Sequence, residues 1–249
     1  MMDIIHVTTY NIHKGFSQFN LRMVLPELKE ELRRVHTDIA FLQEVVGEHR
    51  LHAERHNWPT RSQYEFLADS IWPEYAYGKN AVYPEGHHGN AILSRFPILN
   101  WENVDISAHP LESRGLLHCE IAVPGWDVPL HCINVHLGLG SRGRKKQAAA
   151  IRDRIERVVP HHAPLIIAGD FNDWRRTVGD FLARTLGVQE VFEHVHGAPA
   201  RTYPASLPLL RLDRIYFRGL KVKGAQIYHG RPWSRISDHA VLTAAMSRA

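Results

Sequence analysis

The residues of this sequence that could do chemistry are acids, amides and imidazoles that end or border short apolar runs. The stretch LIIAGDFND, residues 165–173, runs from apolar residues into Asp170 and Asn172. TYNIH and LQEV likewise end an apolar run, with Asn11 and Glu44. RLDRIY and SDHAVL place Asp213, Asp238 and His239 at the start of one. Carboxylates that gather in one place repel one another unless protons or a cation lie between them. A bound metal ion would remove the repulsion, so the pattern predicts a metal site.

The types of residue in this set indicate which ion and which reaction to expect. Oxygen ligands from Asp, Glu and Asn favour a hard divalent ion, Mg²⁺ or Mn²⁺, over the Cys and His ligands of structural zinc. Such an ion acts as a Lewis acid on phosphoryl oxygens. A nearby carboxylate can align or deprotonate a water, and a protonated imidazole can neutralise charge on a phosphorus-centred transition state. The set therefore predicts hydrolysis of a phosphate ester.

Rigid elements must hold these side chains, and the apolar pattern predicts more strands than helices. Alternating apolar runs predict strands at 4–12, 38–44, 91–95, 116–123, 129–136, 165–170, 212–217 and 240–245. Helical spacing marks residues 26–35, 64–72 and 144–159. Some strands are separated by a helix and others by short turns. This order favours one or two mixed sheets over a doubly wound parallel sheet.

A weak internal repeat relates the two halves of the chain. Residues 10–15 read YNIHKG and residues 133–138 read INVHLG, so both carry Asn-x-His-x-Gly. A predicted helix follows each copy, and then a strand that ends in a carboxylate, Glu44 or Asp170. Chance could produce three matched residues, but the matching order of elements favours a duplication. Two related halves would bring four polar strand ends to one rim.

Composition predicts a single globular domain that covers residues 1–249. The chain is 44% hydrophobic and 22% charged, and no linker-like stretch divides it. Its net charge of +4 gives only a slight preference for anionic partners. No apolar run reaches 18 residues, and the first residues enter a strand pattern without a signal peptide. We therefore expect no transmembrane segment and a cytoplasmic location, in which Cys119 and Cys132 stay reduced.

A glycine motif offers a competing interpretation. Gly138, Gly140 and Gly143 spell GxGxxG between a predicted strand and a predicted helix, the context of a dinucleotide-binding loop. The acidic residue expected about 20 positions later is missing, because residues 159–162 read VPHH. The motif therefore gives little support to nucleotide-cofactor binding.

The order of the motifs resembles a known superfamily. The series TYNIH, LQEV, HHGNAILSRFP, NVHLG, GDFND, LDRIYF and SDH, spread over almost the whole length, resembles the endonuclease/exonuclease/phosphatase superfamily, and within it the small bacterial YbhP-like branch. GDFN and a C-terminal SDH are specific together and weak alone. The resemblance implies the DNase I-like fold, a four-layer α-β-β-α sandwich of two mixed β-sheets. It also implies Mg²⁺-dependent hydrolysis of phosphodiesters or phosphomonoesters.

The resemblance also assigns roles at the metal and at the attacking water. Glu44 is similar to the principal metal ligand of the family, with Asn11 and Asp238 beside it. Asp170 matches the residue that positions or activates the water. Asn172 matches an amide that holds a phosphate oxygen or the metal site.

Further roles follow at the phosphate. His239 would contact the phosphate and stabilise the transition state, with Asp213 orienting an imidazole or assisting the metal. His136 resembles the second catalytic histidine, near the leaving group, and Asn90 of GNAILSR would reach the phosphate. His13, which we assign to substrate binding, occupies a place where some DNA-repair members carry Asp. Its imidazole adds no negative charge at neutral pH, which argues against a repair-type DNA activity.

Structural interpretations stay open for several of these residues. Asp170 and Asn172 could cap a turn or a helix after a strand. Asp213, between two arginines, could form a salt bridge, and His13 and His136 could bond to backbone carbonyls. The joint occurrence of acids and imidazoles in one ordered pattern favours the functional interpretation.

The sequence leaves several substrates open and two other classes of protein to compare. The expected substrate is a phosphate ester, with nucleic acid, a phospholipid head-group in transient contact with a membrane, and a small phosphorylated metabolite all open; no protein partner is expected. A two-metal metallophosphoesterase would need Gly-Asn-His-Asp/Glu, whereas residues 88–91 read HGNA. A non-enzymatic module that binds a phosphate ligand on the same fold is the alternative outside enzymes.

Overall fold

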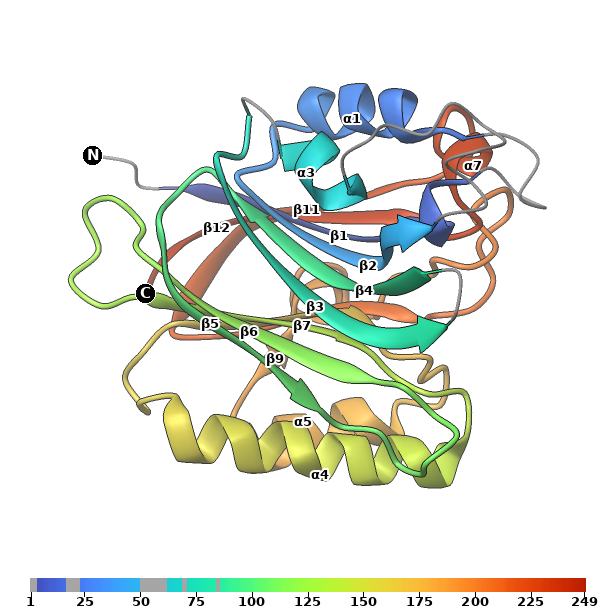
Figure 1. Ribbon diagram of the computed structural model, residues 1–249. Helices are drawn as coiled ribbons and strands as arrows, with labels where there is room; N and C mark the ends of the chain where they lie inside the picture. The colour runs from blue at the N-terminus through green and yellow to red at the C-terminus, as the bar shows by residue number, and fades with distance from the viewer. Residues whose placement is uncertain (1–3, 17–22, 50–61, 69–70, 84–85) are drawn as a thin grey trace.

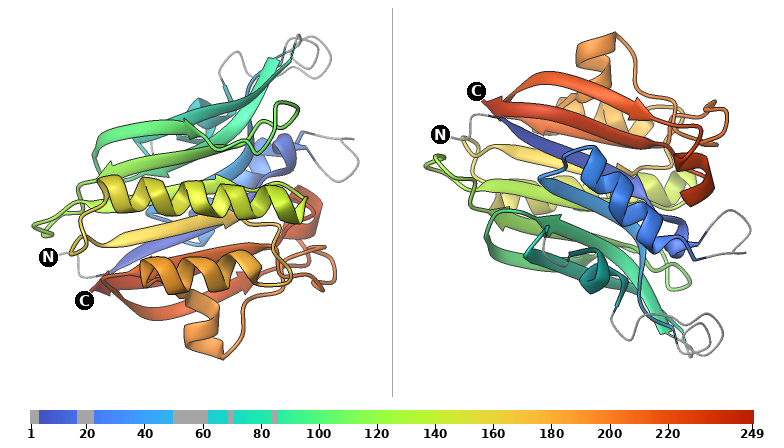
Figure 2. Two further views of the ribbon diagram at one scale, coloured as in Figure 1. Left: turned by 90° about the horizontal axis from the view of Figure 1, so that it is seen from below. Right: turned by 90° about the horizontal axis from the view of Figure 1, so that it is seen from above.

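The computed structural model describes residues 4–16, 23–49, 62–68, 71–83 and 86–249. Within these residues, two six-stranded mixed sheets pack face to face, and helices cover both outer faces (Figure 1). α1 lies over one sheet, whereas α4 and α5 lie over the other (Figure 2). The predicted four-layer α-β-β-α sandwich is thus confirmed.

The two sheets contain strands from different parts of the chain. The first has the order β11-β12-β1-β2-β4-β3 and comprises β1 (Ile5–Asn11), β2 (Ile39–His49), β3 (Glu74–Tyr83), β4 (Gly86–Ser94), β11 (Leu220–Tyr228) and β12 (Val241–Arg248). The second has the order β5-β6-β7-β8-β10-β9 and comprises β5 (Ile98–Asp105), β6 (Gly115–Ile121), β7 (Leu130–His136), β8 (Leu165–Asp170), β9 (Gln189–Glu190) and β10 (Asp213–Arg218). The helices are α1 (Leu25–Arg34), α3 (Gln63–Ala68), α4 (Ser141–Val158), α5 (Thr177–Leu186), α6 (Val191–His196), α7 (Trp233–Ile236) and the short 3₁₀ helix η1 (His13–Gly15).

The strand directions agree with a duplication. In β12-β1-β2-β4 the successive pairs are antiparallel, parallel and antiparallel. The series β6-β7-β8-β10 has the same three directions. In each half a helix, α1 or α4, connects the parallel pair. The Asn-x-His-x-Gly copies therefore occupy equivalent places, at the ends of β1 and β7.

Strand alternation explains how the apolar runs build three layers of core. On β8, Ile166 packs between the sheets, whereas Ile167 points to the opposite face, under α4 and α5. Because both faces of β8 are covered, its sequence is apolar throughout. Cys119 pairs directly with Cys132 across β6 and β7, and both are buried free thiols, as expected.

Sequence patterns missed the elements at the margins of the sheets. β3, β5, β9 and β11 were not predicted, and neither were α5, α6 and α7. β5 and β11 are edge strands with mostly exposed or half-buried residues, so they lack the apolar alternation of a buried strand. The predicted helix at 64–72 corresponds to α3, and its positions 69–70 lie outside the described residues.

The predicted end of one strand was wrong. β2 does not stop at Glu44 but continues to His49. Its pairing with β4 shifts register between Leu42 and Val45, and Glu44 has a φ of +57°. Glu44 therefore lies in a β-bulge, which redirects its side chain without ending the strand.

No helix within the described ranges is both long and apolar enough to cross a bilayer. The cytoplasmic location stays an expectation from the sequence.

Candidate active site

Strand direction gathers the polar residues at one end of the sandwich. β1 ends there, parallel β2 reaches the same place at Glu44, and β12, antiparallel to β1, begins there. β7 and β8 end at the same place in the second sheet, where antiparallel β10 begins, so Asp213 pairs with Asp170. A hydrogen bond from Asn11 Nδ2 to Asp170 Oδ2, at 3.2 Å, joins the two sheets at this rim.

Asp170 is the centre of this group and is only 1% exposed. Its Oδ2 lies 3.4 Å from His136 Nε2 and 3.9 Å from His239 Nε2. Its Oδ1 accepts a hydrogen bond from the backbone N–H of Asn172 at 3.0 Å. Burial raises the pKa of Asp170, and this outweighs the two imidazoles, which lower it. A carboxylate with a raised pKa is a better general base than an ordinary one.

His239 and Asp213 form a buried ion pair beside Asp170. His239 Nδ1 donates to Asp213 Oδ2 at 2.9 Å. Burial acts to lower the pKa of His239, but the carboxylates of Asp213, Asp170 and Asp238 raise it to about 10. His239 is therefore an imidazolium at neutral pH. Its Nε2 lies 3.9 Å from Asp170 Oδ2. Thr202 Oγ1 accepts from the backbone N–H of Asp213 at 3.2 Å and fixes the start of β10.

Glu44 and Asn11 form a second pair at the rim. Asn11 Nδ2 donates to Glu44 Oε1 at 3.2 Å, and Asn11 Oδ1 accepts from the backbone N–H of His13 at 3.1 Å. Burial opposes ionisation of Glu44, yet His136 and Asn11 hold its pKa below the ordinary value. Glu44 is thus a half-buried, ionised oxygen donor.

Asp238 is in contact with His13 at the same rim. Its Oδ1 is 3.3 Å from His13 Nδ1, and this contact raises the pKa of His13 while it lowers that of Asp238. The charge of Glu44 also raises the pKa of His13, so both carboxylates lie near this ring. Ser237 Oγ donates to the backbone carbonyl of Asn11 at 2.7 Å and ties the SDH segment to the end of β1.

His136 differs from the other two imidazoles. Burial lowers its pKa, and Arg114 lowers it further, although Asp170 and Glu44 raise it. His136 is therefore neutral at pH 7, next to a protonated His239. Asp170 is therefore in contact with two imidazoles, a neutral one from His136 and a charged one from His239.

Asn90 and Asn134 connect the sheets instead of lining the rim. Asn134 Nδ2 donates to the carbonyls of Leu42 and Ala91 at 2.9 and 2.8 Å, and its Oδ1 accepts from Gln43. Asn90 is buried, and its Nδ2 donates to the carbonyl of Gly115 at 3.1 Å. The structure gives both amides a bridging role; the phosphate contact of Asn90 stays a prediction.

The residues after Asp170 position the loop that leaves β8. Asn172 has a φ of +49°, and its Nδ2 donates to the carbonyl of Leu137 at the end of β7. Asp173 Oδ2 accepts from the N–H of Val178 at 2.7 Å and caps α5. Asn172 thus keeps its place at the site, whereas Asp173 belongs to the scaffold.

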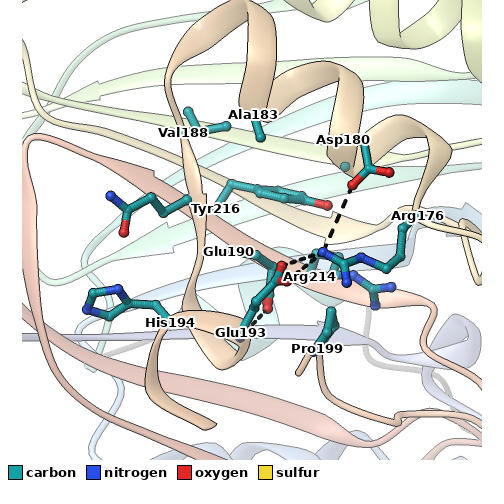
Figure 3. A pocket seen from close by; sticks show the side chains of 12 residues that line it. Arg176, Asp180, Ala183, Val188, Glu190, Glu193, His194, Pro199, Arg214 and Tyr216 are labelled. Atoms are coloured by element: carbon teal, nitrogen blue, oxygen red, sulfur yellow. Dashed lines mark hydrogen bonds and ion pairs between the residues drawn. The ribbon is translucent and has the colours of Figure 1, made fainter. Parts of the chain in front are cut away.

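A hollow of about 270 Å³ lies between α5, α6 and β10 (Figure 3). Arg176 is bonded there to both carboxylate oxygens of Glu193, and Glu190 caps α6. Arg214 is buried and donates to the carbonyl of Asp213 at 2.9 Å. Arg214 is a positioning residue that the sequence pattern did not single out as functional, because its role depends on this packing.

Two groups of side chains at the rim, which share no residue, are candidates to hold a metal ion. Asp170, Asp213 and His239 each offer a ligand atom, all within 4.8 Å of one another, and Asp213 Oδ1 is buried without a hydrogen-bond partner among the described residues. A protonated His239 has no lone pair to donate, however. Glu44 is bonded to Asn11, and Asp238 contacts His13, whose pKa Glu44 also raises; these residues supply the oxygen atoms that a hard divalent ion prefers. The second group therefore fits Mg²⁺ better.

Fold and site together define a DNase I-like protein with an acid–imidazole centre. The sequence pattern of the Endonuclease/Exonuclease/phosphatase family matches residues 8–239. The chain therefore belongs to this family, as the motifs predicted.

Relatives and solved structures agree with this assignment. The chain is 48% identical over 239 residues to the uncharacterized protein YbhP of Escherichia coli, which is 96% of this chain and 94% of that one. An endonuclease/exonuclease/phosphatase from Beutenbergia cavernae superposes with a TM-score of 0.77 at 18% identity, over 99% of this chain and 72% of that chain. D. rerio TDP2 humanized by 14 mutations gives a TM-score of 0.74 at 20% identity, over 98% and 99%. The two structures support the fold.

Proposed function

We propose that this protein is a Mg²⁺-dependent phosphoesterase that hydrolyses phosphodiester bonds through metal-assisted attack of water. The observation that carries the proposal is the position of Asp170, a buried carboxylate of raised pKa between a neutral His136 and a protonated His239. Family membership agrees with a hydrolase acting on phosphoester bonds.

The proposed mechanism assigns one task to each part of the rim. Glu44, Asn11 and Asp238 would hold the ion. As a Lewis acid, the ion would stabilise negative charge on the phosphoryl oxygens. Asp170 would accept a proton from the attacking water. The water oxygen would bond to phosphorus while the bond from phosphorus to the leaving oxygen breaks.

The imidazoles would act on the phosphate itself. His239, kept protonated by Asp213, would donate from Nε2 to a non-bridging oxygen, where negative charge grows in the transition state. His136 would orient Asp170 and lie near the leaving group. We assign Asn172, His13 and Asn90 to phosphate or substrate contact.

The proposal leaves the type of phosphate ester to be identified. D. rerio TDP2 has been solved with a single-strand DNA product, and the human Nocturnin catalytic domain with a bound sulfate anion. Both are similar to this chain in fold at 19% identity. Nucleic acid, a phospholipid head-group and a phosphorylated metabolite are the substrates to compare.

Turnover of bis-p-nitrophenyl phosphate with Mg²⁺ or Mn²⁺ tests the proposal. Asp170→Asn and His239→Gln keep side-chain size, and each should reduce kcat by about 100-fold or more, because a general base or a charge on the transition state is lost. Asp180→Asn, an exposed carboxylate on α5, is the matched control and should leave kcat unchanged. EDTA should abolish turnover, and the divalent ion should restore it.

Full turnover by Asp170→Asn would contradict the assigned role. If the unmodified protein bound phosphate esters and hydrolysed none of them with either ion, the non-enzymatic binding module would be the better account.

A further inference from the structure

Large apolar side chains are exposed on the loops that surround the candidate active site. We call residues 106–114, 137–140, 171–176 and 203–211 the rim loops. They precede β6 and β10 or follow β7 and β8, so strand direction places all four at the catalytic end. Their exposed apolar residues are Leu111, Leu139, Trp174, Leu207, Leu209 and Leu210. Such a concentration at one end of a molecule marks a surface that contacts something apolar.

The loop with three of these leucines is held firmly. The backbone N–H groups of Leu209 and Leu210 both donate to the carbonyl of Tyr203 at 2.8 Å, and the N–H of Thr202 donates to the carbonyl of Leu210 at 2.7 Å. Leu207 is 67% exposed and Leu209 58% exposed despite this bonding. The leucines are thus presented to solvent by an ordered backbone.

The same loop contacts Asp238 and His239 of the candidate active site. The N–H of Ala205 donates to the carbonyl of Asp238 at 2.7 Å, and the Tyr203 ring lies 5.2 Å from the His239 ring. In Figure 1 the orange chain before β10 lies near α7, at the end to which the β2 arrow points. Whatever the leucines contact is therefore brought next to the imidazolium.

The surface around this loop is cationic. Arg201 and Arg211 lie in or beside this loop, and the N–H of Gly230 donates to the carbonyl of Ala205 at 2.8 Å, which brings Arg231 close to it. Arg201, Arg231 and Arg235 are exposed and form no ion pair with any residue in the described ranges. Arg201 also lines a groove of about 850 Å³ with Leu207 and Ile227, so positive charge and apolar surface adjoin.

We propose that the rim loops dock on the surface of an anionic phospholipid bilayer. The leucines would enter the boundary between head-groups and acyl chains, and the arginines would contact lipid phosphates. Exposed leucines add nothing to contact with a nucleic-acid backbone, and a surplus of positive charge disfavours pairing with a second copy of this chain. Docking would hold phosphoesters of the bilayer in front of Asp170; this last step alone rests on the proposed function.

Flotation with lipid vesicles tests the docking without any need for turnover. The protein should float with vesicles of equimolar phosphatidylglycerol and phosphatidylcholine and stay in solution with phosphatidylcholine alone. Leu209→Asp should weaken the partition by about tenfold or more, because the burial of one leucine is lost and a negative charge is added. Leu207→Asp should act in the same direction.

Leu99→Asp is the matched control. Leu99 is also 58% exposed, but it lies at the start of β5, at the opposite end of the second sheet. Flotation of this variant should equal that of the unmodified protein. The urea midpoint of Leu209→Asp should equal that of Leu99→Asp, which shows that the variant is folded.

Three results would overturn the docking proposal. These are equal flotation of Leu209→Asp and Leu99→Asp, failure to float with anionic vesicles, and a protein that is dimeric without lipid and becomes monomeric in Leu209→Asp. If the protein floats as expected but hydrolyses no ester, the docking stands and the proposed function fails.

Discussion

Replacing Asp213 with asparagine tests how the rim keeps His239 charged. Burial alone would lower the pKa of His239, and Asp213, 2.9 Å from Nδ1, is the largest of the influences that raise it to about 10. Relative to an ordinary value of about 6.5, the shift corresponds to about 5 kcal/mol in favour of the protonated form. Because the folded-state pKa is raised, this stabilisation is complete below pH 6.5 and is lost as the pH rises through about 10.

Asparagine keeps the size of Asp213 and removes its charge, so the pKa of His239 should fall to about 6.5 or below. At about pH 8.5 roughly 1% of His239 would then be protonated, whereas at about pH 5.5 most of it would be. The rate of the variant relative to the unmodified protein should therefore drop about 100-fold more at pH 8.5 than at pH 5.5.

Two measurements check this expectation. NMR titration of the His239 ring in the metal-free protein should show its pKa directly, and the pH profile of bis-p-nitrophenyl phosphate hydrolysis should show the lost alkaline activity. Asp180→Asn should change neither. A ratio of rates that is the same at both pH values, or a variant His239 whose pKa stays near 10, would refute the reasoning.

Three further predictions concern the scaffold. Gly169 has a φ of +143°, and a Cβ there would lie 1.9 Å from the Val135 carbonyl oxygen, so Gly169→Ala should destabilise the fold by at least about 3 kcal/mol in urea unfolding. Asn134→Ala removes both donors to two buried backbone carbonyls and should reduce the free energy of unfolding by about 2–4 kcal/mol, with the urea midpoint as the measurement. Burial, His131 and Arg154 lower the pKa of His118 to about 3, so the unfolded chain takes up a proton near pH 6.5 that the folded one does not. Stability should fall by about 2 kcal/mol from pH 7 to pH 5 through His118, and a dependence just as steep in His118→Gln would refute this.

The chemical character of the rim was predictable from the sequence. In LIIAGDFND an apolar run that fits a central strand ends in Asp170, and the structure places that residue at the end of β8. The same logic located Asn11, His136 and Asp213, because a strand that ends or begins at a rim leaves its polar residue there. Apolar alternation is local, so a single sequence contains it.

Other features depended on contacts between distant segments. Asn11 and Asn134 occupy the same place in the repeat, yet Asn11 donates to the side chain of Asp170 at the rim, whereas Asn134 donates to buried backbone carbonyls. The bulge that turns Glu44 to the site arises from pairing with β4, about 45 residues later. The edge strand β5 left no apolar pattern, because one face of it lies in solvent.

The sequence by itself indicated that acids and imidazoles at strand ends would gather at one rim, and the order of its motifs implied a two-sheet sandwich through a family resemblance. Only the tertiary structure decided which of them are charged. His136 and His239 are the same residue type at two strand ends, but burial leaves His136 neutral, whereas the carboxylate of Asp213 keeps His239 protonated. A pKa depends on the distance to other charges and on the exclusion of water, and both are set by how the two sheets pack together.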